Sequence, residues 1–141
     1  MLKNIDPRLS PELLMNLAEM GHGDEIVIAD GNFPGASVNP NCLRYDTSGV
    51  PNLLEAVLSV LPLDPYSDWQ YGLMETVGDD PTPPIWSEYK DLVEAAYPGA
   101  TVKQIERFEF YERARQAFAV VVTGETALYA NIILKKGVVT P

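Results

Sequence analysis

His22 is the only histidine of the chain and the side chain best suited to proton transfer at neutral pH. It lies in the segment Met-Gly-His-Gly-Asp-Glu-Ile-Val-Ile-Ala-Asp, where a helical pattern gives way to a strand pattern. Imidazole titrates near neutrality, which suits a general acid or base. Gly21 and Gly23 remove side-chain cover, so another molecule can approach the ring closely. The alternative is a helix C-cap in which one of these glycines is left-handed and His22 has no chemical role.

A second set of polar side chains lies where predicted strands end or begin. Asp30 ends the first strand, Arg107 ends the strand before the last helix, and Tyr129 and Asn131 lead into the final strand. Ligands of open α/β sheets collect outside the carboxyl ends of the strands. Carboxylate, amide and phenol groups suit a neutral, polyhydroxylated ligand. Because His22 precedes the first strand, we expect a site shared between subunits.

Each of these candidates also has a purely structural alternative. Asp30 could accept a hydrogen bond from its own loop in an Asx-turn. Arg107 could pair with Glu106 or Glu109 at the surface, where such a pair stabilises by about 1 kcal/mol at most. Tyr111 could be a core residue.

The composition excludes several classes of function. Ten Lys and Arg against twenty Asp and Glu give a net charge of −10 over 141 residues. Such a surface repels phosphate backbones and anionic lipid, so we expect neither nucleic acid nor a membrane as partner. No apolar run is long enough to span a bilayer, and the first residues lack the apolar core of a secretion signal. Cys42 is the only cysteine, which favours the cytoplasm.

The residue counts also argue against a metal. One Cys and one His exclude the usual zinc sites, which take three or four ligands mostly from these types. Asp79 and Asp80 are the candidates for an all-carboxylate magnesium site, but Gly-Asp-Asp-Pro-Thr-Pro-Pro is more typical of a solvated turn. The Walker and dinucleotide glycine patterns are absent. We therefore expect no cofactor.

The hydrophobic patterns predict a single three-layer α/β domain over residues 1–141, with about six strands in a mainly parallel sheet and about four flanking helices. The continuous apolar run after Glu25 is typical of a strand buried on both faces. Gly31 to Asn41 is predicted to be a loop. The predicted strands are 25–30, 42–45, 69–77, 102–106, 119–123 and 131–135, and the predicted helices follow Ser10 and cover 52–61, 86–96 and 108–118.

Three long motifs together resemble a known family. Met20 to Asp30, followed by Asn-Phe-Pro, resembles the N-terminal signature of the ribose pyranase and L-fucose mutarotase family. Arg-Phe-Glu-Phe-Tyr-Glu-Arg-Ala from Arg107 looks like the fucose mutarotase branch, as does the tail 117–138. Two positions depart from the pattern: Ala36, where some relatives carry a second histidine, and Ala130, where a glycine is common.

The resemblance implies a cofactor-free sugar mutarotase that assembles into a ring-shaped homo-oligomer, commonly a decamer of two pentamers. It implies that the active sites lie where neighbouring subunits meet. In that case His22 is the acid/base, and the sugar is held by Asp30, Arg107, Tyr129, Asn131 and Tyr111.

The implied reaction needs only acid–base help and hydrogen bonds. Exchange of α and β anomers opens the ring to an aldehyde, rotates C1–C2 and closes the ring on the other face. The alternatives are a ribose pyranase, a non-catalytic monosaccharide-binding transport accessory protein, and a scaffold whose oligomer is its function.

Overall fold

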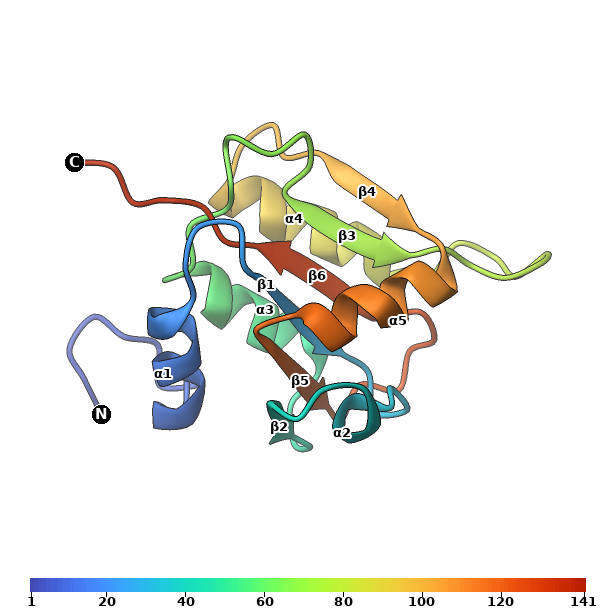
Figure 1. Cartoon of the computed structure of the whole chain (residues 1–141), viewed down its shortest axis with the longest axis horizontal. Helices are drawn as coiled ribbons and strands as arrows, with labels where there is room; N and C mark the ends of the chain where they lie inside the picture. Colours follow the sequence, from blue (N-terminus) through green and yellow to red (C-terminus); the bar gives the residue numbers. More distant parts are fainter.

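The computed structural model describes residues 1–141 and contains one six-stranded sheet with five helices (Figure 1). The strand order is β2-β5-β1-β6-β3-β4. The strands are β1 (Glu25–Ala29), β2 (Cys42–Tyr45), β3 (Tyr71–Met74), β4 (Val102–Ile105), β5 (Ala119–Thr123) and β6 (Ile132–Lys135). The helices are α1 (Pro11–Glu19), α2 (Gly35–Val38), α3 (Val50–Leu58), α4 (Ile85–Ala96) and α5 (Arg107–Gln116).

The direction of β6 determines which loops meet. Strand β1 pairs in parallel with β5, which pairs in parallel with β2, and β3 pairs in parallel with β4. Strand β6 lies between β1 and β3 and is antiparallel to both. The other five strands therefore point the same way. We call the end where these five strands finish and β6 starts the carboxyl end of the sheet, and the opposite end its amino end.

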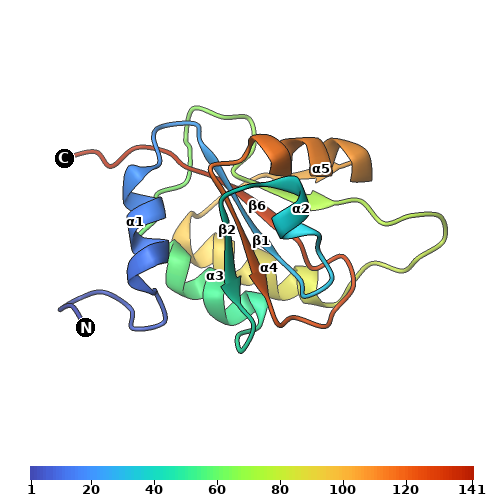
Figure 2. The same ribbon diagram turned by 60° about the horizontal axis from the view of Figure 1, so that its bottom comes forward.

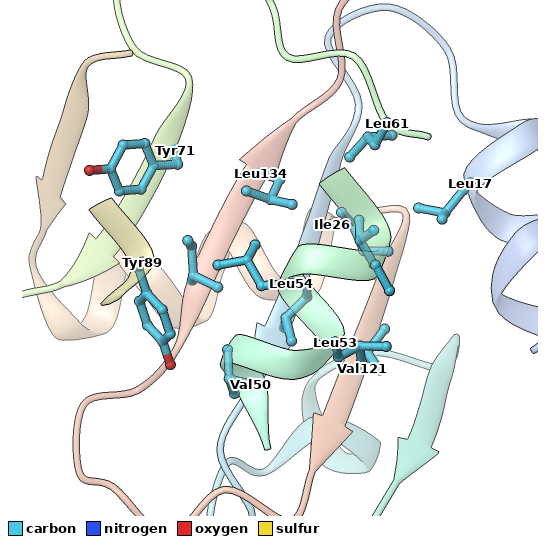
Figure 3. Packing of buried hydrophobic residues seen from close by; sticks show 14 of the residues in the cluster. Leu17, Ile26, Val50, Leu53, Leu54, Leu61, Tyr71, Tyr89, Val121 and Leu134 are labelled. Atoms are coloured by element: carbon cyan, nitrogen blue, oxygen red, sulfur yellow. The ribbon is translucent and has the colours of Figure 1, made fainter. Parts of the chain in front are cut away.

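Helices cover both faces of the sheet, as a three-layer domain requires (Figures 1 and 2). Alternate residues of β1 point to opposite faces, so Ile26 and Ile28 belong to one core and Val27 and Ala29 to the other. The first core lies under α1, α3 and α4, and Figure 3 shows Leu54, Tyr89 and Leu134 within it. The second core lies under α5. Burial on both faces explains the continuous apolar run of β1.

Side-chain caps start two of the helices, and the cap of α1 is the one that its sequence predicts. Ser10 Oγ accepts the Leu13 N–H at 3.1 Å ahead of α1, with proline at the first helical position. Glu106 caps α5 by accepting the Phe108 and Glu109 N–H groups. This capping corrects one expectation: Arg107 is the first residue of α5, not the last residue of a strand.

Three further boundaries differ from the sequence-based prediction. Strand β3 covers only Tyr71–Met74 of the predicted 69–77, because its parallel partner β4 offers only four residues. Helix α3 begins at Val50 and ends at Leu58, not 52–61. The predicted loop 31–41 contains α2, where a side chain on Gly35 would lie 2.4 Å from Val122 Cγ2. Glycine lets this one-turn helix pack directly on the sheet.

Candidate functional site

Asp30 and Asn131 meet at the carboxyl end of the sheet, between the ends of adjacent strands. The Asn131 Oδ1 accepts the Asp30 backbone N–H at 2.9 Å, and both residues are buried. Burial raises the pKa of the Asp30 carboxyl, and the N–H groups of Asn32, Ala130 and Phe33 oppose the shift only in part. A carboxylate held against its desolvation cost is typical of a functional site.

The Asx-turn alternative for Asp30 describes its geometry correctly. Asp30 Oδ1 accepts the Asn32 N–H at 2.9 Å, the turn expected of an aspartate that begins such a loop. The turn uses one lone pair of one oxygen, and a carboxylate offers about four. The Asp30 carboxylate can therefore accept further hydrogen bonds besides the one in this turn.

Tyr129 lies beside them in a left-handed backbone conformation, φ 54°. Its carbonyl accepts the Trp86 Nε1–H of α4 at 2.8 Å, and the next carbonyl, of Ala130, accepts the Tyr89 hydroxyl at 2.7 Å. The Tyr129 hydroxyl donates to Asp80 and accepts the Val77 N–H at 3.2 Å. The bond to Asp80 raises the pKa of the Tyr129 phenol. Helix α4 and the β3–α4 loop thus fix this residue from two sides.

Arg107 and Tyr111, on α5, lie at the same end of the sheet. The exposed Arg107 guanidinium lies over the Phe108 ring, 4.7 Å from its centroid, and its positive charge opposes part of the rise in the pKa of the Tyr129 phenol. Arg107 forms no close ion pair with Glu106 or Glu109, and its charge contributes only the smallest part of the lowering of the Glu106 pKa. The half-buried Tyr111 ring packs against Phe33, with centroids 5.5 Å apart.

His22 lies at the amino end of the sheet, in a turn that presents its ring. The Asp24 N–H donates to the Gly21 carbonyl, and Gly23 has φ +86°, as the third position of a type II turn requires. The helix C-cap alternative is wrong, because α1 ends at Glu19 and its cap, Met20, has φ −59°. The imidazole side chain is 45 % exposed, and its Nε2 lies 2.9 Å from Asp64 Oδ1.

The two groups of residues are too far apart to serve one monosaccharide within one chain. The five residues of β1 separate His22 from Asp30, and at about 3.3 Å per residue they span about 16 Å. A general base must lie within hydrogen-bond reach of the proton it removes, or one water away. The candidate residues of one chain therefore form two separate groups, one at each end of the sheet.

Asp64 is the residue of this region that sequence reasoning missed. It lies 42 positions after His22, in the connection between α3 and β3, and only the fold brings them together. Tyr66 also contacts the histidine, with ring centroids 5.5 Å apart. The segment Leu-Asp-Pro-Tyr that contains both residues is typical of a turn, and nothing in it points to the histidine.

The magnesium alternative gains no support from the arrangement of carboxylates. Asp79 and Asp80 are exposed in the β3–α4 loop, and Asp80 accepts the Tyr129 hydroxyl. No three His, Cys, Asp or Glu side chains gather as a set of metal ligands.

No helix is long and apolar enough to cross a membrane.

The fold and these polar groups together define an α/β protein with a cluster of polar side chains at the carboxyl end of its sheet and a separate, exposed histidine at the amino end. The chain belongs to the RbsD / FucU transport protein family, which it matches over residues 3–139. It is 54 % identical to the human fucose mutarotase, over 97 % of this chain and 94 % of that protein. It is 50 % identical to an L-fucose mutarotase of Haemophilus influenzae, over 98 % of this chain and 97 % of that one.

Solved structures agree with this assignment. The fucose mutarotase from Streptococcus pneumoniae, in complex with L-fucose, superposes with a TM-score of 0.93 at 47 % identity, covering 99 % of this chain and 100 % of that chain. The RbsD of Bacillus subtilis, complexed with D-ribose, has a TM-score of 0.74 at 24 % identity, with 99 % and 100 % coverage, and shows the shared fold alone.

Proposed function

We propose that this protein is a cofactor-free L-fucose mutarotase, an isomerase that interconverts the α and β anomers of L-fucose. The observation that carries the proposal is the likeness, over nearly the whole chain, to proteins named fucose mutarotase, one of which has L-fucose bound. Residues 1–141 act as one mutarotase domain. We place the enzyme in the cytoplasm, the default for a chain with a single cysteine.

The proposed reaction is general acid–base catalysis at a hemiacetal carbon. His22 removes the proton of the C1 hydroxyl while a solvent water protonates the ring oxygen, and the C1–O5 bond breaks to give the open aldehyde. After rotation about C1–C2, the O5 hydroxyl attacks the other face of the aldehyde and returns its proton to the solvent hydroxide, while protonated His22 gives its proton to O1. Positioned proton transfer typically accelerates a reaction about 10²- to 10⁴-fold, which is useful for a reaction that already proceeds in water.

The residues at the carboxyl end bind the sugar hydroxyl groups. The Asp30 carboxylate accepts hydrogen bonds from paired hydroxyls, and the Asn131 amide donates or accepts according to its orientation. Arg107 donates from its exposed guanidinium, and Tyr129 and Tyr111 provide ring faces with polar tips. None of these contacts requires a metal or a redox cofactor.

We propose further that each active site combines the carboxyl-end residues of one subunit with the His22 turn of a neighbouring subunit. Because His22 and Asp30 lie at opposite ends of β1, the carboxyl end of one subunit has to meet the histidine turn of another. Repetition of this head-to-tail contact forms a ring when the rotation from one subunit to the next closes on itself. The family resemblance suggests a decamer of two pentamers.

Saturation-transfer NMR of L-fucose at anomeric equilibrium tests the proposal. The wild-type protein should accelerate exchange between the α and β anomers well above the buffer rate, and His22→Ala should return exchange to that rate. Undiminished exchange in His22→Ala removes His22 from the mechanism. Binding of fucose without any acceleration by the wild type indicates a sugar-binding accessory protein instead, and faster exchange of D-ribose than of L-fucose indicates a pyranase.

A further inference from the structure

Helix α3 begins without a capping side chain of its own. Its N-cap is Gly49, and a proline follows Val50 in its first turn, so Val50 carries the first free N–H of the helix. Glu125 Oε2, from the turn after β5, accepts this N–H at 3.3 Å. A side chain on Gly49 would lie 3.0 Å from the same oxygen, so glycine leaves room for the carboxylate. Glu125 therefore caps α3 from a distant part of the chain, where a negative charge is favourable.

The other carboxylate oxygen of Glu125 holds the turn that leads to two of the candidate sugar-binding residues. Its Oε1 accepts the Thr126 N–H at 2.9 Å and the Ala127 N–H at 3.0 Å. Tyr129 and Asn131 follow directly in the chain. One side chain thus joins the start of this segment to the N-terminus of α3.

The backbone of Glu125 is bonded to both neighbours of Asp30. Its carbonyl accepts the Gly31 N–H at 2.9 Å. Its N–H donates to Thr123 Oγ1 at 3.1 Å, and the buried Thr123 hydroxyl donates to the Ala29 carbonyl at 2.8 Å. The residues before and after Asp30 are therefore both tied to Glu125.

We propose that Glu125 is a positioning residue that holds Asp30 and the segment Tyr129–Asn131 in the arrangement that binds the sugar. This inference rests on the proposed fucose site. Asp30 follows β1 and Asn131 precedes β6, so a residue that grips both loops fixes the distance between the two side chains. Groups that are ordered before a ligand arrives pay no ordering cost when it binds. Glu125 thereby acts on the affinity for fucose through these residues.

Fucose binding and amide hydrogen exchange test the proposal. Glu125→Ala removes all three hydrogen bonds of the side chain. We expect the Kd for L-fucose, measured by calorimetry, to rise on the order of 10-fold, the cost of ordering about one further residue on binding. The Gly31 amide should also exchange faster, although its acceptor is the Glu125 backbone. An unchanged exchange rate at Gly31 overturns the proposal, whether or not the protein is a mutarotase.

Glu125→Gln separates the turn from the helix cap. The glutamine Oε1 can still accept both N–H groups of the turn, and its N–H₂ then faces the Val50 N–H, so the cap and its charge are lost. The urea midpoint should fall, while the affinity for fucose and the exchange rate at Gly31 stay close to those of the wild type. An affinity as low as that of Glu125→Ala would assign the effect to the cap and refute the hold on the turn.

Val57→Ala is the matched control for stability. Val57 is buried in α3, about two turns beyond Val50, so its truncation should lower the urea midpoint and leave the Glu125 contacts in place. Its affinity for fucose should equal that of the wild type. If this control loses affinity in parallel with Glu125→Ala, general stability explains the loss and the proposal is wrong.

The rates separate positioning from a merely structural role. At saturating fucose, Glu125→Ala should exchange anomers as fast as the wild type because His22 is unchanged, so KM rises while kcat does not fall. A lower kcat at an unchanged KM contradicts the proposal.

Two further outcomes remain decisive. If Glu125→Ala does not fold, Thr123→Val removes the link to Ala29 and should weaken fucose binding; an unchanged affinity then refutes the proposal. Absence of anomer exchange by the wild type refutes the mutarotase function alone, and the Gly31 measurement still decides the role of Glu125.

Discussion

Replacement of Asp30 by asparagine should stabilise the protein while it destroys sugar binding. The side chain is nearly isosteric, and the asparagine Oδ1 can still accept the Asn32 N–H. The substitution removes a charge that burial disfavours, since the pKa of Asp30 is raised. An aspartate whose folded pKa lies above its unfolded value is more readily ionised in the unfolded chain, so its ionisation opposes folding at neutral pH.

The magnitude follows from the opposing contributions. A hydrogen bond to a charged acceptor is stronger than one to a neutral acceptor by about 1 kcal/mol, and this loss limits the gain. The upward pKa shift indicates that desolvation outweighs those hydrogen bonds, so we expect a net stabilisation of about 0.5 to 2 kcal/mol, the usual range for a single stabilising substitution. For 141 residues, 1 kcal/mol raises Tm by about 3 °C, so the expected increase in Tm is about 1.5 to 6 °C.

Urea and thermal unfolding between pH 7 and pH 4 measure this effect, and Asp91→Asn serves as the control for net charge because Asp91 is exposed on α4. The advantage of Asp30→Asn should shrink as the pH falls through the folded pKa of Asp30, because the wild-type carboxyl then becomes neutral as well. Calorimetry should show loss of fucose binding. An Asp30→Asn protein that is less stable than the wild type at pH 7, or an advantage independent of pH, refutes the reasoning.

Two further substitutions test the support of the carboxyl end. Tyr89→Phe removes the 2.7 Å hydrogen bond to the buried Ala130 carbonyl and should lower the free energy of unfolding in urea by about 1 to 3 kcal/mol. Tyr71→Phe breaks no such bond and should lower it by less, so equal losses would contradict this account. Tyr129→Phe removes the hydrogen bonds of its hydroxyl with Val77 and Asp80, so amide hydrogen exchange in residues 75–84 should accelerate while β3 keeps its protection. An unchanged exchange rate in this loop shows that other contacts hold it.

Local chemistry explains why so much of the fold can be predicted from the sequence. Ser10 followed by proline begins α1, and the cores of the strands at 42–45, 102–105 and 119–123 are found where the apolar pattern predicts them. These elements depend on caps and periodicity, which act over a few residues. Strand β3 and helix α2 escape the same reasoning, because pairing with β4 and packing of Gly35 on the sheet are contacts with distant segments.

The candidate site shows the same distinction between what local sequence indicates and what tertiary contacts decide. The sequence alone indicates His22, Asp30, Asn131 and Tyr129 by residue type and by position at strand ends, and the order of His22 and Asp30 along β1 already separates them. The antiparallel insertion of β6 beside β1, which brings Asn131 to Asp30, and the pairing of His22 with Asp64 across 42 positions are decided only by the tertiary structure. Hydrogen bonds between remote segments depend on strand order and register. The burial of whole sheet faces selects this order and register, and no local sequence pattern encodes them.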